Sequence, residues 1–431
     1  MLTEHIRRKK SVAPVSEDPP EKSISRPIES MGPIKPQERI IEIDVLRGFA
    51  ILGMVIWDFR SISYGNYASK EGFDYLVCGI IRILDFDNTV YPLFSFLFGW
   101  GIAMQMMRSH ARDMPFVSMY LRRLLVLCMI GVLNYFLFEK GDILHIYALI
   151  GAFLPFFWNR SNRTILVSSA LLIATPALVG SLLSIYMSPQ LYGTGLGNAL
   201  TEQLVISTNY MGMVIARMQD FIETHTHPYV YVSNLDILGL FLLGLYVGRR
   251  GVFQNIPGNS RFIRRVLWYS LAVGLLWLGW DFAMRQLEIW ANGDSGWLMP
   301  VYRLLNKWSV QALVKLYSHH ALSMFYACVI VLLLQDNRWR RYLRPLAIAG
   351  QMALTNYLLK AFIASTIFFG YGLALRGKLG CALGEVLAVV VFGFLIVLGR
   401  WWLRRYQFGP VEWLWRSLTY LKFQQMQVRI S

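Results

Sequence analysis

Asp142 and His145 have the residue types and the spacing from which acid–base chemistry can be built. Because they are three residues apart, their side chains share one face if the segment is helical. A carboxylate beside an imidazole orients the ring and stabilises its protonated form, as general acid–base catalysis requires. The alternative is structural, since an aspartate at a helix start accepts hydrogen bonds from unpaired backbone N–H groups. The pair is therefore a candidate catalytic site, with helix capping as the alternative.

The remaining histidines are weaker candidates. His225 and His227 flank one threonine in a polar segment, a spacing that suits acid–base chemistry, metal binding or a solvated surface. His319 and His320 would relay protons if they were buried, or would lie at the lipid headgroups if a helix begins after them. The four cysteines are scattered without metal-ligand spacing, so we expect no metal site and no disulfide framework.

The composition indicates which elements must hold these side chains. Hydrophobic residues make up 55% of the 431 positions, and runs long enough to cross a bilayer recur along the chain. A formal charge of +16 would fit a nucleic-acid partner in a soluble protein, but here Lys and Arg form short clusters between apolar runs. The sequence therefore excludes nucleic-acid binding and predicts an all-α, polytopic integral membrane protein surrounded by lipid.

About ten transmembrane helices are predicted. Loops rich in arginine alternate with weakly charged loops, and the positive-inside rule then places both termini in the cytoplasm. The expected spans lie near 44–60, 88–107, 119–138, 143–158, 164–187, 232–248, 266–283, 311–334, 345–370 and 382–402.

Four regions follow from this pattern. Residues 1–38 are polar and contain prolines, which predicts a disordered cytoplasmic tail. Residues 39–187 form an N-terminal membrane half of about five spans, and 188–231 an extracytoplasmic loop with an apolar part suited to an interfacial or re-entrant helix. Residues 232–431 form the C-terminal membrane half, which ends in a cytoplasmic amphipathic helix.

Charged and polar side chains inside the spans need protein or water as neighbours. Asp44 and Arg47 can pair one helical turn apart, and the same stripe leads to Asp58. A charge within hydrocarbon costs roughly 2.5–3.5 kcal/mol on insertion scales, so this stripe should face protein or water, unless it is an interfacial anchor. Thr355 and Asn356 either hold helices together or line a cavity.

Five motifs in order resemble the bacterial YeiB-like membrane proteins, a family whose domain of unknown function is called DUF418. The resemblance covers roughly residues 40–425, and the opening helix with Tyr91-Pro92-Leu93-Phe94 is also similar to the heparan-glucosaminide N-acetyltransferase group. The motifs are Asp44-Val-Leu-Arg47-Gly48, Leu93-Phe94-Ser95-Phe96-Leu97-Phe98-Gly99, Gly141-Asp142-Ile143-Leu144, Met352-Ala-Leu-Thr355-Asn356-Tyr357-Leu358 and Phe408-Gly409-Pro410-Val411-Glu412-Trp413-Leu414-Trp415-Arg416.

The resemblance implies a multi-pass protein of the bacterial inner membrane that passes an acyl group from a cytoplasmic donor, such as acyl-CoA, to an extracytoplasmic glycan or lipid. Acetyltransferases of that group have a catalytic histidine in the outer loop that corresponds to residues 59–84. This chain has no histidine there, so the resemblance implies that His145 with Asp142 would be the acid–base pair. Arginines suit a phosphate-rich donor because the planar guanidinium binds oxygens bidentately. The alternative is a transporter or lipid-binding carrier that uses the same cavity without chemistry. The residues expected to contact donor or substrate are Asp44, Arg47, Asp58, Asp87, Arg122, Arg123, Thr355 and Asn356.

Overall fold

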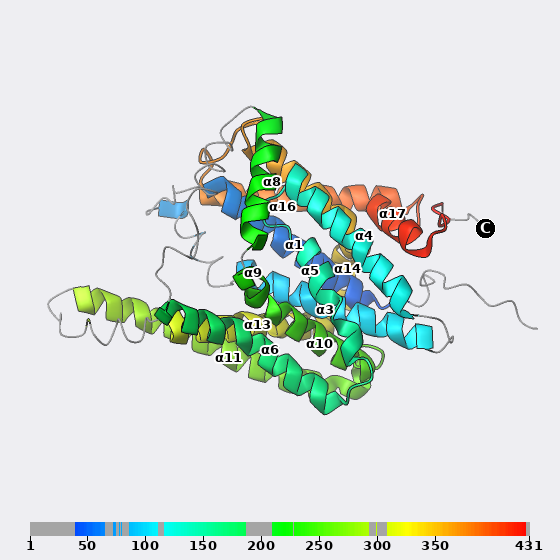
Figure 1. Ribbon diagram of the computed structural model, residues 1–431, viewed down its shortest axis with the longest axis horizontal. Coiled ribbons are helices and arrows are strands. Elements are labelled where there is room, and N and C mark those ends of the chain that lie inside the picture. The colour runs from blue at the N-terminus through cyan, green and yellow to red at the C-terminus, as the bar shows by residue number, and fades with distance from the viewer. Residues whose placement is uncertain are drawn as a thin grey trace, which may run out of the picture. The chain divides into compact units, whose positions relative to one another are not determined.

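Helix α1 (Ile41–Tyr64) packs against several other helices (Figure 1). It begins with Glu42 and Asp44 in its first turn, where negative side chains are favoured by the helix dipole. Its neighbours are α3 (Phe86–His110), α13 (Trp308–Leu333), α14 (Asn337–Gln351), α15 (Ala353–Phe368) and α16 (Cys381–Leu403).

The computed structural model describes residues 39–64, 72–74, 77, 79, 86–110, 116–186, 209–226, 228–292, 299 and 308–427. Most of these residues are helical, and they contain no β-strand, apart from an isolated bridge between Tyr406 and Gln427. All the helices belong to the second of two units, Ile40–Ser431, and the predicted tail 1–38 lies outside the described residues. The remaining elements are α4 (Phe116–Leu137), α5 (Leu144–Gly151), the 3-10 turn Leu154–Phe157, α6 (Asn162–Tyr186), α8 (Tyr210–Thr226), α9 (Pro228–Ser233), α10 (Leu235–Arg249), α11 (Ile256–Asn292) and α17 (Pro410–Tyr420).

Several helices are long and apolar enough to cross a membrane, which indicates a multi-pass membrane protein. The predicted count of ten is not confirmed, because five helices in the described part of the chain meet both conditions and a bent pair would make a sixth. The five segments are Thr89–Ser109, Phe116–Leu137, Asn162–Val179, Val230–Arg249 and Cys381–Leu403.

Two expected spans are interrupted. The segment expected as one span over 143–158 is the eight-residue α5 followed by a 3-10 turn, and Pro155 at the turn accounts for the change of helix type. The span expected over 345–370 is broken at Met352, where α14 and α15 meet at 80°. Glu412 of α17 stabilises this break, because its carboxylate accepts hydrogen bonds from the backbone N–H groups of Leu354 and Thr355.

Helices α1 and α14 approach each other closely because glycines lie at their contact. A Cβ atom at Gly48 would overlap the backbone of Leu346, and one at Gly350 would overlap the backbone of Asp44. Small residues at such crossings let helix backbones approach in membrane proteins. The charged first turns of α1 are therefore held directly against the helix that ends at the Met352 break.

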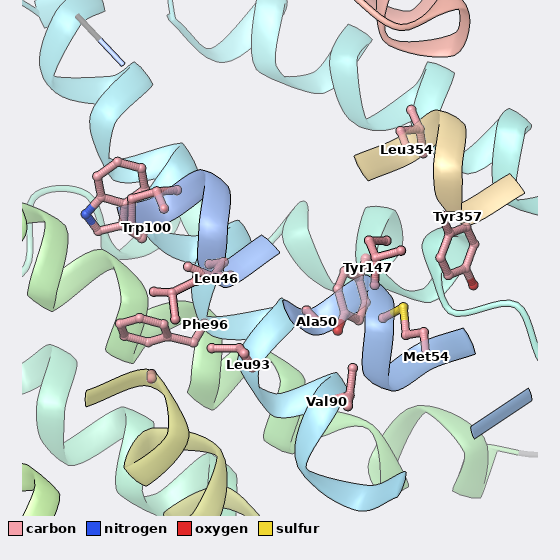
Figure 2. Packing of buried hydrophobic residues seen from close by; sticks show 14 of the residues in the cluster. Leu46, Ala50, Met54, Val90, Leu93, Phe96, Trp100, Tyr147, Leu354 and Tyr357 are labelled. Atoms are coloured by element: carbon pink, nitrogen blue, oxygen red, sulfur yellow. The ribbon is translucent and has the colours of Figure 1, made fainter. Parts of the chain in front are cut away.

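Buried apolar side chains fill the space between α1, α3 and α15. They continue to α5, whose Tyr147 is completely buried. Figure 2 shows Leu46, Ala50 and Met54 of α1, Val90, Leu93, Phe96 and Trp100 of α3, Tyr147 of α5, and Leu354 and Tyr357 of α15. The core therefore holds in place the part of α1 that carries Asp58 and the start of α5 that carries His145.

The cysteine prediction needs a correction. Cys381, at the first position of α16, is disulfide-bonded, whereas Cys128 and Cys328 are free thiols. Scattered cysteines gave no sequence signal for this bond, because pairing depends on tertiary proximity that spacing alone does not reveal.

Candidate functional site

The predicted acid–base pair meets a third side chain at the start of α5. His145 Nδ1 lies 3.6 Å from Asp142 Oδ1, and His145 Nε2 lies 2.8 Å from Nε2 of His225, in the last turn of α8. Asp142 and His145 are each only 1% exposed. The structure therefore brings together the two residues predicted from their spacing and adds His225, which the sequence offered only as a weaker candidate.

The hydrogen positions in this site follow from its partners. His225 Nδ1 lies 2.8 Å from the Phe221 carbonyl oxygen, which can only accept, so this nitrogen carries a hydrogen. Burial lowers the pKa of His225, which favours its neutral form and leaves its Nε2 as an acceptor. His145 then donates from Nε2. If His145 takes up a proton, its Nδ1 hydrogen faces Asp142, so both ends of the imidazolium are compensated.

Asp142 has two structural roles at once. Its Oδ1 accepts from the backbone N–H of Leu144 at 2.7 Å, and its Oδ2 accepts from the Asn134 amide at 2.7 Å. The capping interpretation is thus correct in that Asp142 secures the start of α5. Capping also fixes the carboxylate beside His145, and the two interpretations are compatible.

Aromatic rings and a second set of charges hold α8 in place. The Phe221 ring stacks on His225 with 4.0 Å between the ring centroids. Tyr135 donates to Asp220 at 2.5 Å, and Lys140 pairs with the same carboxylate at 2.6 Å. These contacts fix His225 against α4 and α5.

A buried charge cluster lies beside the histidines. The Lys360 ammonium contacts the carboxylates of both Asp58 and Glu139, and the distances to the two Glu139 oxygens are 3.1 and 2.9 Å. All three residues are buried, although Lys360 is separated from Asp58 by 302 positions in the sequence. Lys360 also lies 4.5 Å from the centroid of the Tyr357 ring.

The cluster and the histidine site share one electrostatic environment. Tyr357 interacts with the charges of Asp142, Glu139 and Asp58, and its hydroxyl lies 3.5 Å from the backbone nitrogen of Ile143. Asp142 and Glu139 also interact directly with each other. A proton gained or lost at either group therefore changes the field at the other.

Arginines gather at the opposite end of α1. Arg47 pairs with Asp44 at 3.7 Å, as the one-turn spacing predicts. Arg123 of α4 interacts with the charges of Arg47 and Arg416, and its guanidinium lies 4.1 Å from the centroid of the Trp415 ring. Three cations thus converge from α1, α4 and α17, an arrangement that suits a phosphate-bearing ligand.

The other predicted contact residues lie elsewhere or have structural partners. Arg122 is exposed, and its Nε donates to the Ser118 carbonyl. Thr355 donates its hydroxyl to Glu412, and Asn356 donates to the Ala349 carbonyl at 2.9 Å, so both support the break between α14 and α15. The side chain of Asp87 lies outside the described residues, as does His227.

His319 and His320 are buried rather than at an exposed boundary. His320 Nε2 lies 3.3 Å from Asp236 Oδ2, and the same carboxylate oxygen accepts from the Tyr91 hydroxyl at 2.5 Å. This second polar cluster joins α3, α10 and α13 and does not include the Asp142–His145 pair. The Tyr91 hydroxyl provides the Asp236 carboxylate with the hydrogen-bond partner that a buried polar group needs.

Sequence reasoning missed the central roles of Glu139 and Lys360. The signal for Glu139 was present in the charged stretch Glu139-Lys140-Gly141-Asp142, and that for Lys360 was a cation within an apolar run. An ionisable residue at such a place points to a buried partner. No spacing rule identifies that partner when it comes from a distant helix.

Two family matches together cover the site. Residues 39–279 match the family described as "Heparan-alpha-glucosaminide N-acetyltransferase, catalytic", which is more than half of the chain. Residues 247–422 match the family described as "Protein of unknown function (DUF418)". The first range contains Asp58, Glu139, His145 and His225, and the second contains Lys360.

Similar proteins span nearly the whole chain. The uncharacterized protein YxaH of Bacillus subtilis is 29% identical, over 92% of this chain and 98% of its own length. An uncharacterized 39.9 kDa protein from the amylase 3' region of Bacillus acidopullulyticus is 27% identical, over 90% and 96%. The uncharacterized protein YeiB of Escherichia coli is 25% identical, over 89% and 96%. No solved structure matches the chain significantly.

Proposed function

The chain belongs to the YeiB-like DUF418 family and, through residues 39–279, to the heparan-alpha-glucosaminide N-acetyltransferase catalytic family, and from this premise we propose that it is a membrane acyltransferase. It transfers an acyl group from a phosphate-bearing thioester such as acyl-CoA to an amine or hydroxyl of a glycan or lipid. His145 is the general base, and Asp142 stabilises its protonated form.

The observation that carries this proposal is the placement of His145 between the Asp142 carboxylate and the His225 imidazole. A neutral His145, whose Nε2 hydrogen faces His225, removes the proton from the acceptor O–H or N–H with its Nδ1 as the acceptor attacks the acyl carbon. The acyl–sulfur bond breaks, the new acyl–oxygen or acyl–nitrogen bond forms, and the thiolate takes up the proton. Asp142 compensates the imidazolium in between.

The donor end of the proposal rests on Arg47, Arg123 and Arg416. These arginines meet at the N-terminal part of α1, whereas Asp58 lies towards its other end, about 16 Å from Arg47 at 1.5 Å per residue. A donor held by its phosphates at the arginines must therefore extend its acyl group through the bundle. This distance favours transfer between the two membrane faces over a reaction confined to one.

The proposed orientation puts the arginines and both termini in the cytoplasm and His145 on the extracytoplasmic side of a bacterial inner membrane. The alternation of arginine-rich loops supports it. The disulfide at Cys381 also supports it, because disulfides persist in oxidising compartments outside the cytoplasm. The three similar proteins come from bacteria.

The test uses the full-length protein in lipid nanodiscs with acetyl-CoA as donor and glucosamine or glycerol as acceptor. Thiol release measures turnover. His145→Gln should slow it at least about 100-fold, the usual contribution of a general base, while acetyl-CoA binding persists. Asp142→Asn should slow it less. Glu223→Gln, an exposed change on the same helix as His225, is the matched control and should have no effect. Turnover at the wild-type rate in His145→Gln would contradict the assignment.

A carrier without catalysis is the second candidate. The buried cluster of Asp58, Glu139 and Lys360 favours it, because ionisable residues inside a membrane domain commonly mark substrate or ion pathways. Binding of acetyl-CoA without thiol release for either acceptor, combined with acceptor movement across proteoliposomes, would favour the carrier over the enzyme.

A further inference from the structure

Asp58 and Glu139 share one lysine in a buried site. Their exposed fractions are 1% and 8%, and that of Lys360 is 1%. If both carboxylates are ionised, the three residues carry a net charge of −1. An uncompensated charge is costly in an apolar interior, so a neutral form of the cluster is strongly favoured.

The contacts show where a neutralising proton would lie. The Lys360 ammonium donates to one oxygen of Asp58 and to both oxygens of Glu139, which uses its three hydrogens. Asp58 Oδ1 is buried and has no donor among the described residues. Asp58 also lies within hydrogen-bond reach of Glu139. Two carboxyl groups can form such a bond only if one of them carries a hydrogen.

The titratable groups around the cluster lie before α5, on α8 and on α15, the helix of Lys360 itself. Asp142, before α5, adds a negative charge near Glu139, whereas the positive charge of Arg217 on α8 interacts favourably with Glu139. Tyr357 of α15 adds a neutral hydroxyl. Three carboxylates and two cations leave one negative charge. One proton therefore neutralises the whole group.

We propose that Asp58 and Glu139 form a proton-binding site that holds one exchangeable proton between the two carboxyl groups, with Lys360 as the fixed counter-charge. The site is separate from acyl transfer and exists whether the protein is an enzyme or a carrier. Transfer of the proton to His145 leaves the total charge of the group and His145 taken together unchanged. The neighbouring histidine site is thus the natural exchange partner.

The proton should leave in the alkaline range. Burial raises the pKa of Glu139 to about 8, and the Asp58 charge adds to this effect while Lys360 opposes it. The carboxyl pair titrates as a unit, so the proton belongs to the pair rather than to one residue.

Infrared difference spectroscopy of the full-length protein in nanodiscs tests the site directly. A protonated carboxyl group has a C=O stretching band that a carboxylate lacks. The wild type should show one such band that disappears as the pH rises through about 8. Glu139→Gln and Asp58→Asn should each lose it, and both replacements keep the size of the side chain. Glu412→Gln removes a different buried carboxyl group and should keep the band.

The outcomes separate this proposal from the proposed function, because the spectrum needs neither donor nor acceptor. Absence of a titrating carboxyl band in the wild type would overturn the proton site. Its persistence in both Glu139→Gln and Asp58→Asn would do the same. A band that vanishes on addition of sodium at constant pH would assign a metal cation to the site instead of a proton. Loss of acyl transfer alone would leave the spectral result unchanged.

Discussion

Lys360→Met removes the cation from the buried cluster while keeping an unbranched side chain of similar length. Asp58 and Glu139 are then left facing each other without the ammonium that contacts both. Breaking a buried ion pair by removing one partner typically costs about 3–5 kcal/mol, because a buried charge remains uncompensated. We expect a loss of this size in the free energy of unfolding at pH 8.

The loss should depend on pH. At pH 5 the carboxyl groups of the variant take up protons, so less charge remains uncompensated and the loss should fall to about half or less. Lys378→Met is the matched control, because Lys378 is exposed. A surface replacement of this kind usually changes stability by no more than about 0.5 kcal/mol.

Unfolding by sodium dodecyl sulfate in mixed micelles, followed by tryptophan fluorescence, measures both variants at the two pH values. The double variant Lys360→Met/Asp58→Asn should lose less than the sum of the two single variants, because neighbouring residues of one network are not additive. A loss below about 1 kcal/mol for Lys360→Met, or an equal loss at pH 5 and pH 8, would refute the reasoning.

Three further predictions use the same unfolding assay. Glu139→Gln should remove a pH dependence of the free energy of unfolding. The raised pKa of Glu139 gives the wild type stability that is fully present below about pH 4.3 and is lost as the pH rises through about 8. Parallel curves of unfolding free energy against pH for the two proteins would contradict this. Glu412→Ala should cost about 1–2 kcal/mol as a lost helix cap, and an unchanged midpoint would count against the capping role. Gly48→Ala should strongly destabilise the protein because its Cβ overlaps the Leu346 backbone, whereas Gly393→Ala meets open space and should be tolerated; equal effects would disprove the close contact.

Helices with a continuous apolar run were predictable from sequence. The expected spans 382–402 and 232–248 correspond to α16 (Cys381–Leu403) and α10 (Leu235–Arg249), since run length alone determines such elements. The break at Met352 was not predictable, because it depends on Glu412, which reaches the start of α15 from another helix. Tertiary contacts of this kind leave no periodic signal.

The site shows the same division. Asp142 and His145 are one turn apart, so spacing predicted their proximity. His225 lies 80 positions from His145, and Lys360 lies 302 positions from Asp58, so only the fold could bring them together. The sequence supplied the residue types, including a lysine in an apolar run. It could not supply the partners, because their approach depends on how α1, α8 and α15 pack.

The most direct test of the proposed reaction is to follow an isotopically labelled acetyl group. Proteoliposomes containing the full-length protein receive labelled acetyl-CoA on one side and glucosamine on the other, and mass spectrometry then measures the acceptor. The account predicts that the label appears on glucosamine with the wild type and not with His145→Gln. Glucosamine that crosses the membrane unlabelled, at equal rates in both proteins, would contradict catalysis at His145.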